Sequence, residues 1–110
     1  MRKWLAGLFF LLVGAIPALA EDLKLEPWQE KAIKLVKKEK KIIDARWSMA
    51  GILWVSMKDD GSRRDGYAEY LCMVLNNAGK PKGRIIVISI FDHAAMQRGD
   101  LRKIGRAGCM

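Results

Sequence analysis

Hydrophobic residues between Pro27 and Ile43 recur with the spacing of an α-helix. On a helical wheel of about 100° per residue they fall within one arc of about 120°, and lysines fill most of the rest. Since proline suits the first helical position, the pattern predicts a helix that begins at Pro27. Glu39 lies inside the apolar arc, so either the helix ends near it or its carboxylate pairs with a base. The apolar positions are Trp28, Ala32, Leu35, Val36, Ile42 and Ile43.

From residue 45 the hydrophobic positions alternate with polar ones, which is the period of a β-strand. A hairpin with a three-residue loop at 49–51 pairs Trp47 with Leu53 and Ala45 with Val55, and it keeps the apolar residues on one face. A single long strand with a bulge at the glycine preserves the alternation equally well. The hairpin is our prediction. The alternating apolar positions are Ala45, Trp47, Met49, Leu53, Val55 and Met57.

Residues 61 to 79 have the pattern of a second helix. Ser62 followed three residues later by Asp65 is a variant of the capping box, and the run from Asn76 to Gly79 is typical of a helix end. Cys72 lies at the margin of the apolar face. That face carries Tyr67, Tyr70, Leu71, Val74, Leu75 and Ala78.

Two further segments follow the second helix. Residues 84 to 91 are β-branched and apolar on both sides, which is the composition of a central strand covered on both faces. Near the C-terminus, Asp100 is a candidate cap for a short helix that carries Leu101, Ile104 and Ala107.

The order of these elements predicts a small α/β domain, with a small α+β domain as the alternative. An N-terminal helix, a strand or β-hairpin, a second helix, a buried strand and a short C-terminal helix give a two- to three-stranded sheet packed by helices. A strand–helix–strand stretch favours a parallel, right-handed crossover. Antiparallel pairing of the first and last strands is the alternative.

The first 20 residues have the three parts of a secretory signal peptide. A basic start at Arg2 and Lys3 precedes an apolar run, and an Ala-Leu-Ala cleavage site ends at Ala20. An uncleaved anchor is the alternative, but the run is shorter than the roughly 20 apolar residues that span a bilayer. We therefore expect a cleaved signal peptide at 1–20 and a single small globular domain at 21–110. The protein is expected in the periplasm if its source is Gram-negative, and otherwise secreted.

Both cysteines, Cys72 and Cys109, fall in the predicted mature domain. In an oxidising compartment an even pair in a small exported domain indicates a disulfide, and separate buried thiols are the alternative. The whole chain has a formal net charge of +8, and removing Arg2 and Lys3 leaves 18 basic against 12 acidic residues, or +6. A basic domain favours anionic partners such as membrane surfaces, acidic proteins or polyanionic glycans. Export makes nucleic acid an unexpected partner.

Charged residues follow two of the predicted strands at the points where these strands end. The run KDDGSRRDG opens the second helix, and an Asp-His pair follows the buried strand. If the strands are parallel, both segments lie at the edge where open α/β sheets bind ligands, and the arginines could hold an anion. Turn and helix-cap chemistry is the alternative. The candidate ligand-binding residues are Asp59, Asp60, Arg63, Arg64, Asp65, Asp92 and His93.

Little in the sequence supports catalysis or cofactor binding. His93 is the only histidine, so a histidine-based zinc site would need cysteine or carboxylate ligands. Cys72 could form a nucleophile and base with His93, but a bridged cysteine is unsuitable. The sequence contains no phosphate-binding loop, CxxC motif or calcium loop. We therefore expect a protein that is not an enzyme and has no cofactor or metal.

Three functions stay open. The preferred hypothesis is an accessory, adaptor or inhibitor-like module that acts through protein contact. Trp28, Trp47, Trp54 and the apolar strand need more cover than the few helices provide, and a protein partner or a homodimer would provide it. The alternatives are a small anionic ligand at the candidate edge, and membrane association through the lysine-rich first helix with Trp28 as an interfacial anchor.

Overall fold

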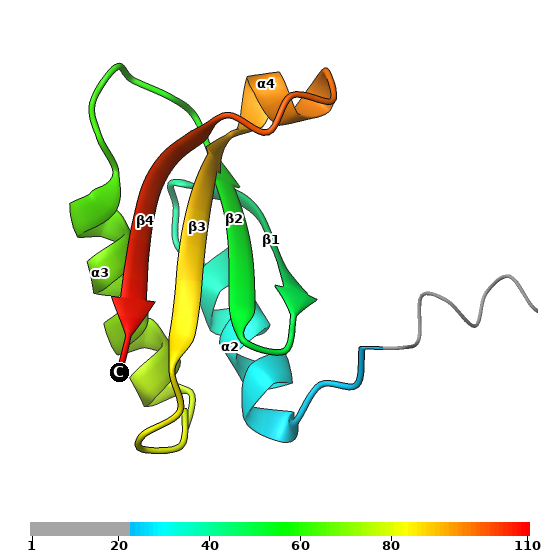
Figure 1. Ribbon diagram of the computed structural model, residues 1–110, viewed down its shortest axis with the longest axis vertical. Coiled ribbons are helices and arrows are strands. Elements are labelled where there is room, and N and C mark those ends of the chain that lie inside the picture. The colour runs from blue at the N-terminus through cyan, green and yellow to red at the C-terminus, as the bar shows by residue number, and fades with distance from the viewer. Residues whose placement is uncertain (1–22) are drawn as a thin grey trace, which may run out of the picture.

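The computed structural model describes residues 23–110, and the predicted signal peptide lies outside them. The described chain forms a four-stranded mixed sheet packed with three helices, an α+β fold (Figure 1). The predicted class is confirmed, whereas the predicted count of two or three strands was too low. The elements are α2 (Pro27–Lys37), β1 (Ile42–Met49), β2 (Ile52–Met57), α3 (Asp65–Asn77), β3 (Ile86–Asp92), α4 (His93–Gln97) and β4 (Lys103–Cys109).

The strands lie in the order β1-β2-β3-β4. β1 and β2 form an antiparallel hairpin, β2 and β3 are parallel, and β4 returns antiparallel to β3. The predicted parallel strand–helix–strand unit is therefore confirmed. Its register positions the candidate site, because Met57 at the end of β2 pairs with Asp92 at the end of β3.

Helix α2 begins at Pro27 as predicted but ends at Lys37, before the apolar stripe does. Ile42 and Ile43, which the stripe included, belong to β1. The chain turns between the two elements, and the Ile42 N–H donates to the Glu39 carbonyl at 3.1 Å. The helix thus ends near Glu39, whose carboxylate accepts from a tyrosine hydroxyl of α3 rather than pairing with a base.

The β1–β2 hairpin has the predicted pairing, with Trp47 opposite Leu53. Its turn is shorter than predicted, since only Ala50 and Gly51 lie between the strands. An irregularity in the ladder between Trp47 and Met49 absorbs the difference. Trp47 and Leu53 stay in the buried core, whereas Met49 pairs with Ile52 and is exposed.

A buried glutamine of α2 fixes the hairpin to the helix. The Gln29 side-chain Nε2 donates to the Ala50 carbonyl at 2.8 Å, and the Trp47 indole N–H donates to the Gln29 carbonyl at 3.0 Å. Trp47 also packs edge-on against Trp28, with ring centroids 5.6 Å apart. Both tryptophans are therefore buried in the core.

The C-terminal segment is a strand, so the predicted short helix through Ile104 and Ala107 is wrong. β4 pairs along β3, with Ala107 opposite Ile88 and Gly105 opposite Ile90. The three-residue spacing of Leu101, Ile104 and Ala107 suits a helix. Small residues at every second position from Gly105 to Cys109 also suit a strand. Pairing with the free side of β3 satisfies the backbone hydrogen bonds that a short helix would leave unmade at its ends.

Helices α2 and α3 cover one face of the sheet, whereas the other face is open except at one end, where α4 lies (Figure 1). Alternate strand residues point to the covered face and form one apolar core with the helices. Its fully buried members include Leu53, Val55, Leu71, Leu75, Ile88 and Ile90.

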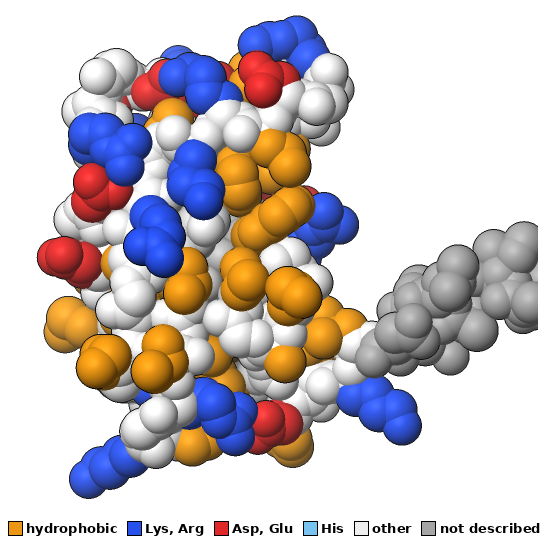
Figure 2. Space-filling view, viewed as in Figure 1, with side chains coloured by type: hydrophobic (Ala, Val, Ile, Leu, Met, Phe, Trp, Pro, Cys, Tyr) orange, Lys and Arg blue, Asp and Glu red, His pale blue; other side chains and the backbone are white. Residues whose placement is uncertain are grey.

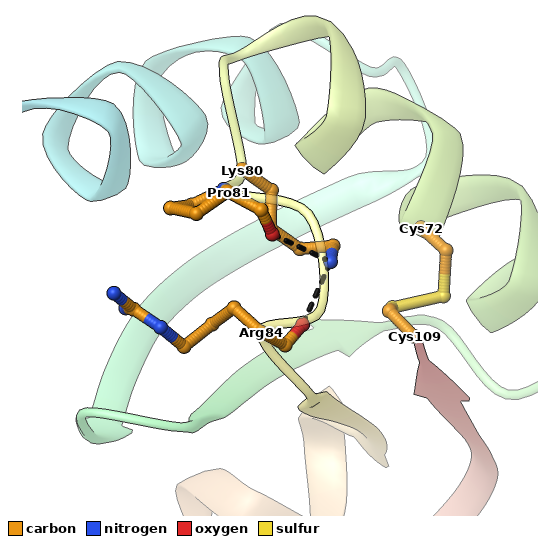
Figure 3. Close-up of a disulfide and its surroundings, with 5 residues drawn as sticks. All are labelled: Cys72, Lys80, Pro81, Arg84 and Cys109. Atoms are coloured by element: carbon orange, nitrogen blue, oxygen red, sulfur yellow. Dashed lines mark hydrogen bonds between the residues drawn. A yellow bond between two sulfur atoms is a disulfide. The ribbon is translucent and has the colours of Figure 1, made fainter.

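Cys72 of α3 and Cys109 of β4 form a disulfide, with the Sγ atoms 2.08 Å apart (Figure 3). The predicted pairing is therefore present, and it ties the last strand to the second helix. A disulfide is compatible with an oxidising, exported location. Export itself stays a prediction.

Candidate functional site

The segments that follow β2 and β3 meet at one edge of the sheet, as the parallel pairing requires. Arg102, in the connection between α4 and β4, joins them. Its Nη2 contacts the Asp59 carboxylate and donates to Asp92 Oδ2 at 3.0 Å. Sequence reasoning missed Arg102 because its two partners lie 43 and 10 residues away along the chain.

The loop between β2 and α3 carries four of the candidate residues, and they line two different pockets. Asp59 and Arg63 line a pocket of about 240 Å³ beside β4, together with Arg102, which we call the edge pocket. Asp60 and Arg64 line a second pocket beside β1. The candidate residues therefore do not share one pocket.

Within this loop the carboxylates bind near neighbours, as they do in turns. Asp60 accepts from the Ser62 N–H at 3.0 Å and from the Ser62 hydroxyl at 2.6 Å. The predicted capping box is wrong, because Ser62 is held by Asp60 and α3 begins at Asp65 with Arg64 as its N-cap.

Asp65 connects the start of α3 to the last strand. Its Oδ1 accepts from the Arg63 guanidinium at 2.8 Å and from the Arg106 backbone N–H at 2.9 Å. Arg63 is thus engaged by a carboxylate, as Arg102 is. Most of the positive charge of the edge pocket is neutralised by the protein itself.

Hydrogen bonds lower the pKa of three carboxyl groups in this region below their ordinary values. In each case a neighbouring donor is the largest cause. For Asp59 the donor with the largest effect on the pKa is the Gly61 N–H, and the Arg102 side chain has the second largest. For Asp60 it is the Ser62 hydroxyl, and for Asp65 it is the Arg63 side chain. The donors stabilise the ionised carboxylates, which stay paired with protein groups.

His93 lies apart from the arginines, at the start of α4. Its Nδ1 is 2.9 Å from the Ser56 Oγ, a contact that the sequence pattern did not reveal. The adjacent Asp92 carboxylate accepts from the Ala94 N–H and from Arg102, so it does not complete a Ser-His-Asp arrangement. Ser56 is only 2% exposed, and a nucleophile has to reach its substrate. The Ser56–His93 contact therefore holds α4 on β2.

The second pocket, of about 380 Å³, is rich in cations, and we call it the basic pocket. Arg64 is anchored there, since its Nη2 donates to the Lys58 carbonyl at 3.0 Å and lies 3.4 Å from Asp60. The Arg64 Nε is buried and has no hydrogen-bond partner among residues 23–110. The lining residues are Lys40, Lys41, Ile43, Met57, Lys58, Asp60 and Arg64.

The open face of the sheet presents apolar side chains between basic ones (Figure 2). The register aligns Arg46, Trp54, Ser89 and Arg106 in one row across the four strands. The neighbouring row holds Met49, Ile52, Val87 and Gly108. β3 is thus central as predicted. On its open-face side Ser89 and Phe91 are buried, Val87 is partly exposed, and α4 covers only the end of the strand.

Trp54 lies at the middle of this open face. Its ring packs edge-on against Phe91, with centroids 4.9 Å apart, and the Arg46 guanidinium lies 5.3 Å from its centroid. Trp54 is partly exposed, whereas the other two tryptophans singled out from the sequence are buried.

Two further properties bear on the kind of site. Within residues 23–110, no three His, Cys, Asp or Glu side chains are grouped closely enough to hold a metal ion. In the same part of the chain, no helix has the length and apolar character that crossing a membrane requires. Trp28, the candidate interfacial anchor, is buried and its indole N–H donates to Glu26.

These features define a small, disulfide-bonded α+β domain with one helix-covered and one open sheet face. Comparison of the chain with protein-family models, curated proteins and solved structures finds no match. The function is therefore argued from the surface and its chemistry.

Proposed function

We propose that this protein is an exported, non-enzymatic binding module that contacts a protein partner through the open face of its sheet. The observation that carries the proposal is the partial exposure of Trp54, Val87 and Ile52 on a sheet face that α4 covers only at one end. A contiguous apolar patch rimmed by polar residues is typical of a protein interaction surface. Partly exposed tryptophan is also among the residues that contribute most to binding energy.

The charges around this patch favour a partner of opposite sign. Arg46 on β1, with Arg106 and Lys103 on β4, flank the apolar centre on both sides, and the Lys103 Nζ lies 6.0 Å from the Phe91 ring centroid. An apolar segment bordered by acidic residues complements this surface. A second copy of the chain would place like charges against one another, so we favour a different protein over a homodimer.

The edge pocket is a weaker basis for function than the open face. Its arginines, Arg63 and Arg102, are already engaged by Asp65 and by the Asp59 and Asp92 carboxylates. The Ser56 hydroxyl is buried, which supports the choice of a binding module over a hydrolase.

Photocross-linking tests the proposal. A photoreactive phenylalanine analogue replaces Val87 on the open face and, as the matched control, Glu69 on the exposed side of α3. Each protein is incubated with the exported fraction of its source. We expect a discrete cross-linked partner from position 87 only, and its loss when Arg46→Glu and Arg106→Glu are added.

The outcomes separate the alternatives. Equal cross-linking from both positions, or none from position 87, would overturn the assignment of the open face. A cross-linked dimer of the chain would retain the open face but replace the acidic partner by a second copy, which sedimentation of the purified protein would confirm.

A further inference from the structure

We propose that the basic pocket binds a phosphate monoester group. The pocket is an open depression of about 380 Å³ and shares no residue with the open-face rows that form the proposed protein-binding surface. It is therefore a separate site, and its test is independent of the proposed function.

The fold builds this pocket from three segments of the chain. Pairing of Ile42 with Met57 brings the turn between α2 and β1 next to the end of β2. That turn, closed by the bond from the Ile42 N–H to the Glu39 carbonyl, carries Lys40 and Lys41. Lys58 follows β2 directly, so the other strand of the same hairpin brings a third lysine to the pocket beside Lys40 and Lys41.

Cations outnumber carboxylates in the lining by four to one. Asp60 is the one carboxylate of this lining, where it binds Ser62 through Oδ1 and pairs with Arg64 through Oδ2 at 3.4 Å. The three lysines, Lys40, Lys41 and Lys58, therefore have no further carboxylate in the lining. Glu39, the acid of the α2–β1 turn, does not line the pocket, since its carboxylate accepts from the Tyr70 hydroxyl at 2.9 Å. The resulting excess of positive charge attracts an anion carrying more than one negative charge.

Arg64 gives the pocket a fixed donor. Its side chain is only 13% exposed, and its Nη2 is held by the Lys58 carbonyl. No hydrogen bond from Nη1 to another group exists within residues 23–110. A guanidinium held in place loses little conformational freedom when it binds an oxyanion, and the lysines can adjust around it as point charges.

The chemistry of a phosphate monoester fits this combination. It carries close to two negative charges at neutral pH and offers three acceptor oxygens. Ile43, 52% exposed, forms an apolar part of the same lining, against which the organic portion of a monoester can rest. A soluble phosphate ester and the headgroup of phosphatidic acid share this chemistry.

Calorimetric titration of the purified, disulfide-bonded protein with phenyl phosphate, at constant ionic strength, tests the soluble form. Cosedimentation with phosphatidylcholine vesicles containing phosphatidic acid tests the lipid form. The test variant is Lys41→Gln/Lys58→Gln, which leaves the structural Arg64 intact. The control is Lys31→Gln/Lys34→Gln, which removes the same charge from the exposed side of α2.

We expect saturable binding of one of the two probes, weakened at least tenfold by Lys41→Gln/Lys58→Gln and less than threefold by the control. Binding of phenyl phosphate without vesicle binding assigns a soluble ester, and vesicle binding that phenyl phosphate competes away assigns the lipid headgroup. Equal weakening by both double variants would show only net-charge attraction and would overturn the proposal. Absence of saturable binding to either probe would overturn it as well.

Discussion

Gly105 of β4 lies directly against the backbone of Arg64, so that a β-carbon at Gly105 would stand 2.6 Å from the Arg64 carbonyl carbon. The neighbouring Arg64 N–H donates to the Ile104 carbonyl at 2.8 Å. This close approach holds the start of α3 on β4 and fixes Arg64 in the basic pocket. Only a residue without a side chain fits there.

Gly105→Ala should therefore lower the free energy of unfolding by about 2–3 kcal/mol, because backbone atoms must move apart to admit a methyl group. Urea unfolding followed by circular dichroism measures the change. Gly108→Ala is the matched control in the same strand, since a β-carbon there meets nothing within 4 Å. Its cost should stay below about 0.5 kcal/mol. Equal stability of the two variants would contradict the close packing of β4 on Arg64.

The Cys72–Cys109 disulfide closes a loop with a sequence separation of 37 residues. In the chain-entropy model its removal costs about 4 kcal/mol, which for a domain of this size lowers the midpoint of thermal unfolding by roughly 15–30 °C. The variant Cys72→Ser/Cys109→Ser should unfold at the same temperature with and without a reducing agent, whereas the native protein should lose stability on reduction. An unchanged midpoint for the reduced native protein would argue against a bridge in solution.

Much of the fold follows from local pattern. Alternation from Ala45 to Met57 predicted the hairpin pairing, and the crossover rule predicted that β2 and β3 are parallel. β4 was missed because its glycines and alanine give only a weak alternating signal, and its Leu101–Ile104 spacing imitates a helix. The strand is stabilised by pairing with β3, which is a tertiary effect that no short window of sequence contains.

The sequence predicted which loops meet at the candidate site, but it did not predict how their side chains pair. Partners of individual charges depend on contacts across the fold, such as Ser56 with His93, which are 37 residues apart. The basic pocket had a detectable signal, however. A hairpin pairing extended to Met57 places Lys58 beside the lysines that precede β1.

Stability should fall in acid because the folded state lowers the pKa of Asp59. Near these pH values the folded protein binds fewer protons than the unfolded chain. The ionised Asp59 therefore stabilises the fold fully above the pKa of the unfolded chain, near 4, and this stabilisation is lost as the pH falls through the lower pKa of the folded state. Asp59→Asn should be less stable at pH 7 and show a shallower loss of stability below pH 4. Asp100→Asn is the control, because Asp100 forms no ion pair among residues 23–110. Parallel acid profiles for Asp59→Asn and the native protein would show that the Gly61 and Arg102 contacts do not persist in solution.

Lys80 organises the connection between α3 and β3, close to the disulfide (Figure 3). It is only 7% exposed, and its Nζ donates to the Arg84 carbonyl at 2.7 Å and the Pro81 carbonyl at 3.3 Å. Lys80→Met keeps a long apolar stem but removes the donors. The Arg84 carbonyl then loses its Lys80 donor, and the Pro81 carbonyl keeps only the bond from the Arg84 N–H. The free energy of unfolding should fall by about 1–3 kcal/mol.

Lys82→Met in the same loop is the matched control, because Lys82 is exposed and makes no side-chain hydrogen bond among the described residues. Its unfolding free energy should change by less than about 0.5 kcal/mol. Urea unfolding measures both variants, and hydrogen exchange of the backbone amides from 83 to 87 locates the effect. If Lys80→Met destabilises through this loop, those amides lose protection while the β1–β2 hairpin retains it. Uniform loss of protection across the sheet would instead contradict a local role of the Lys80 ammonium donors in this loop.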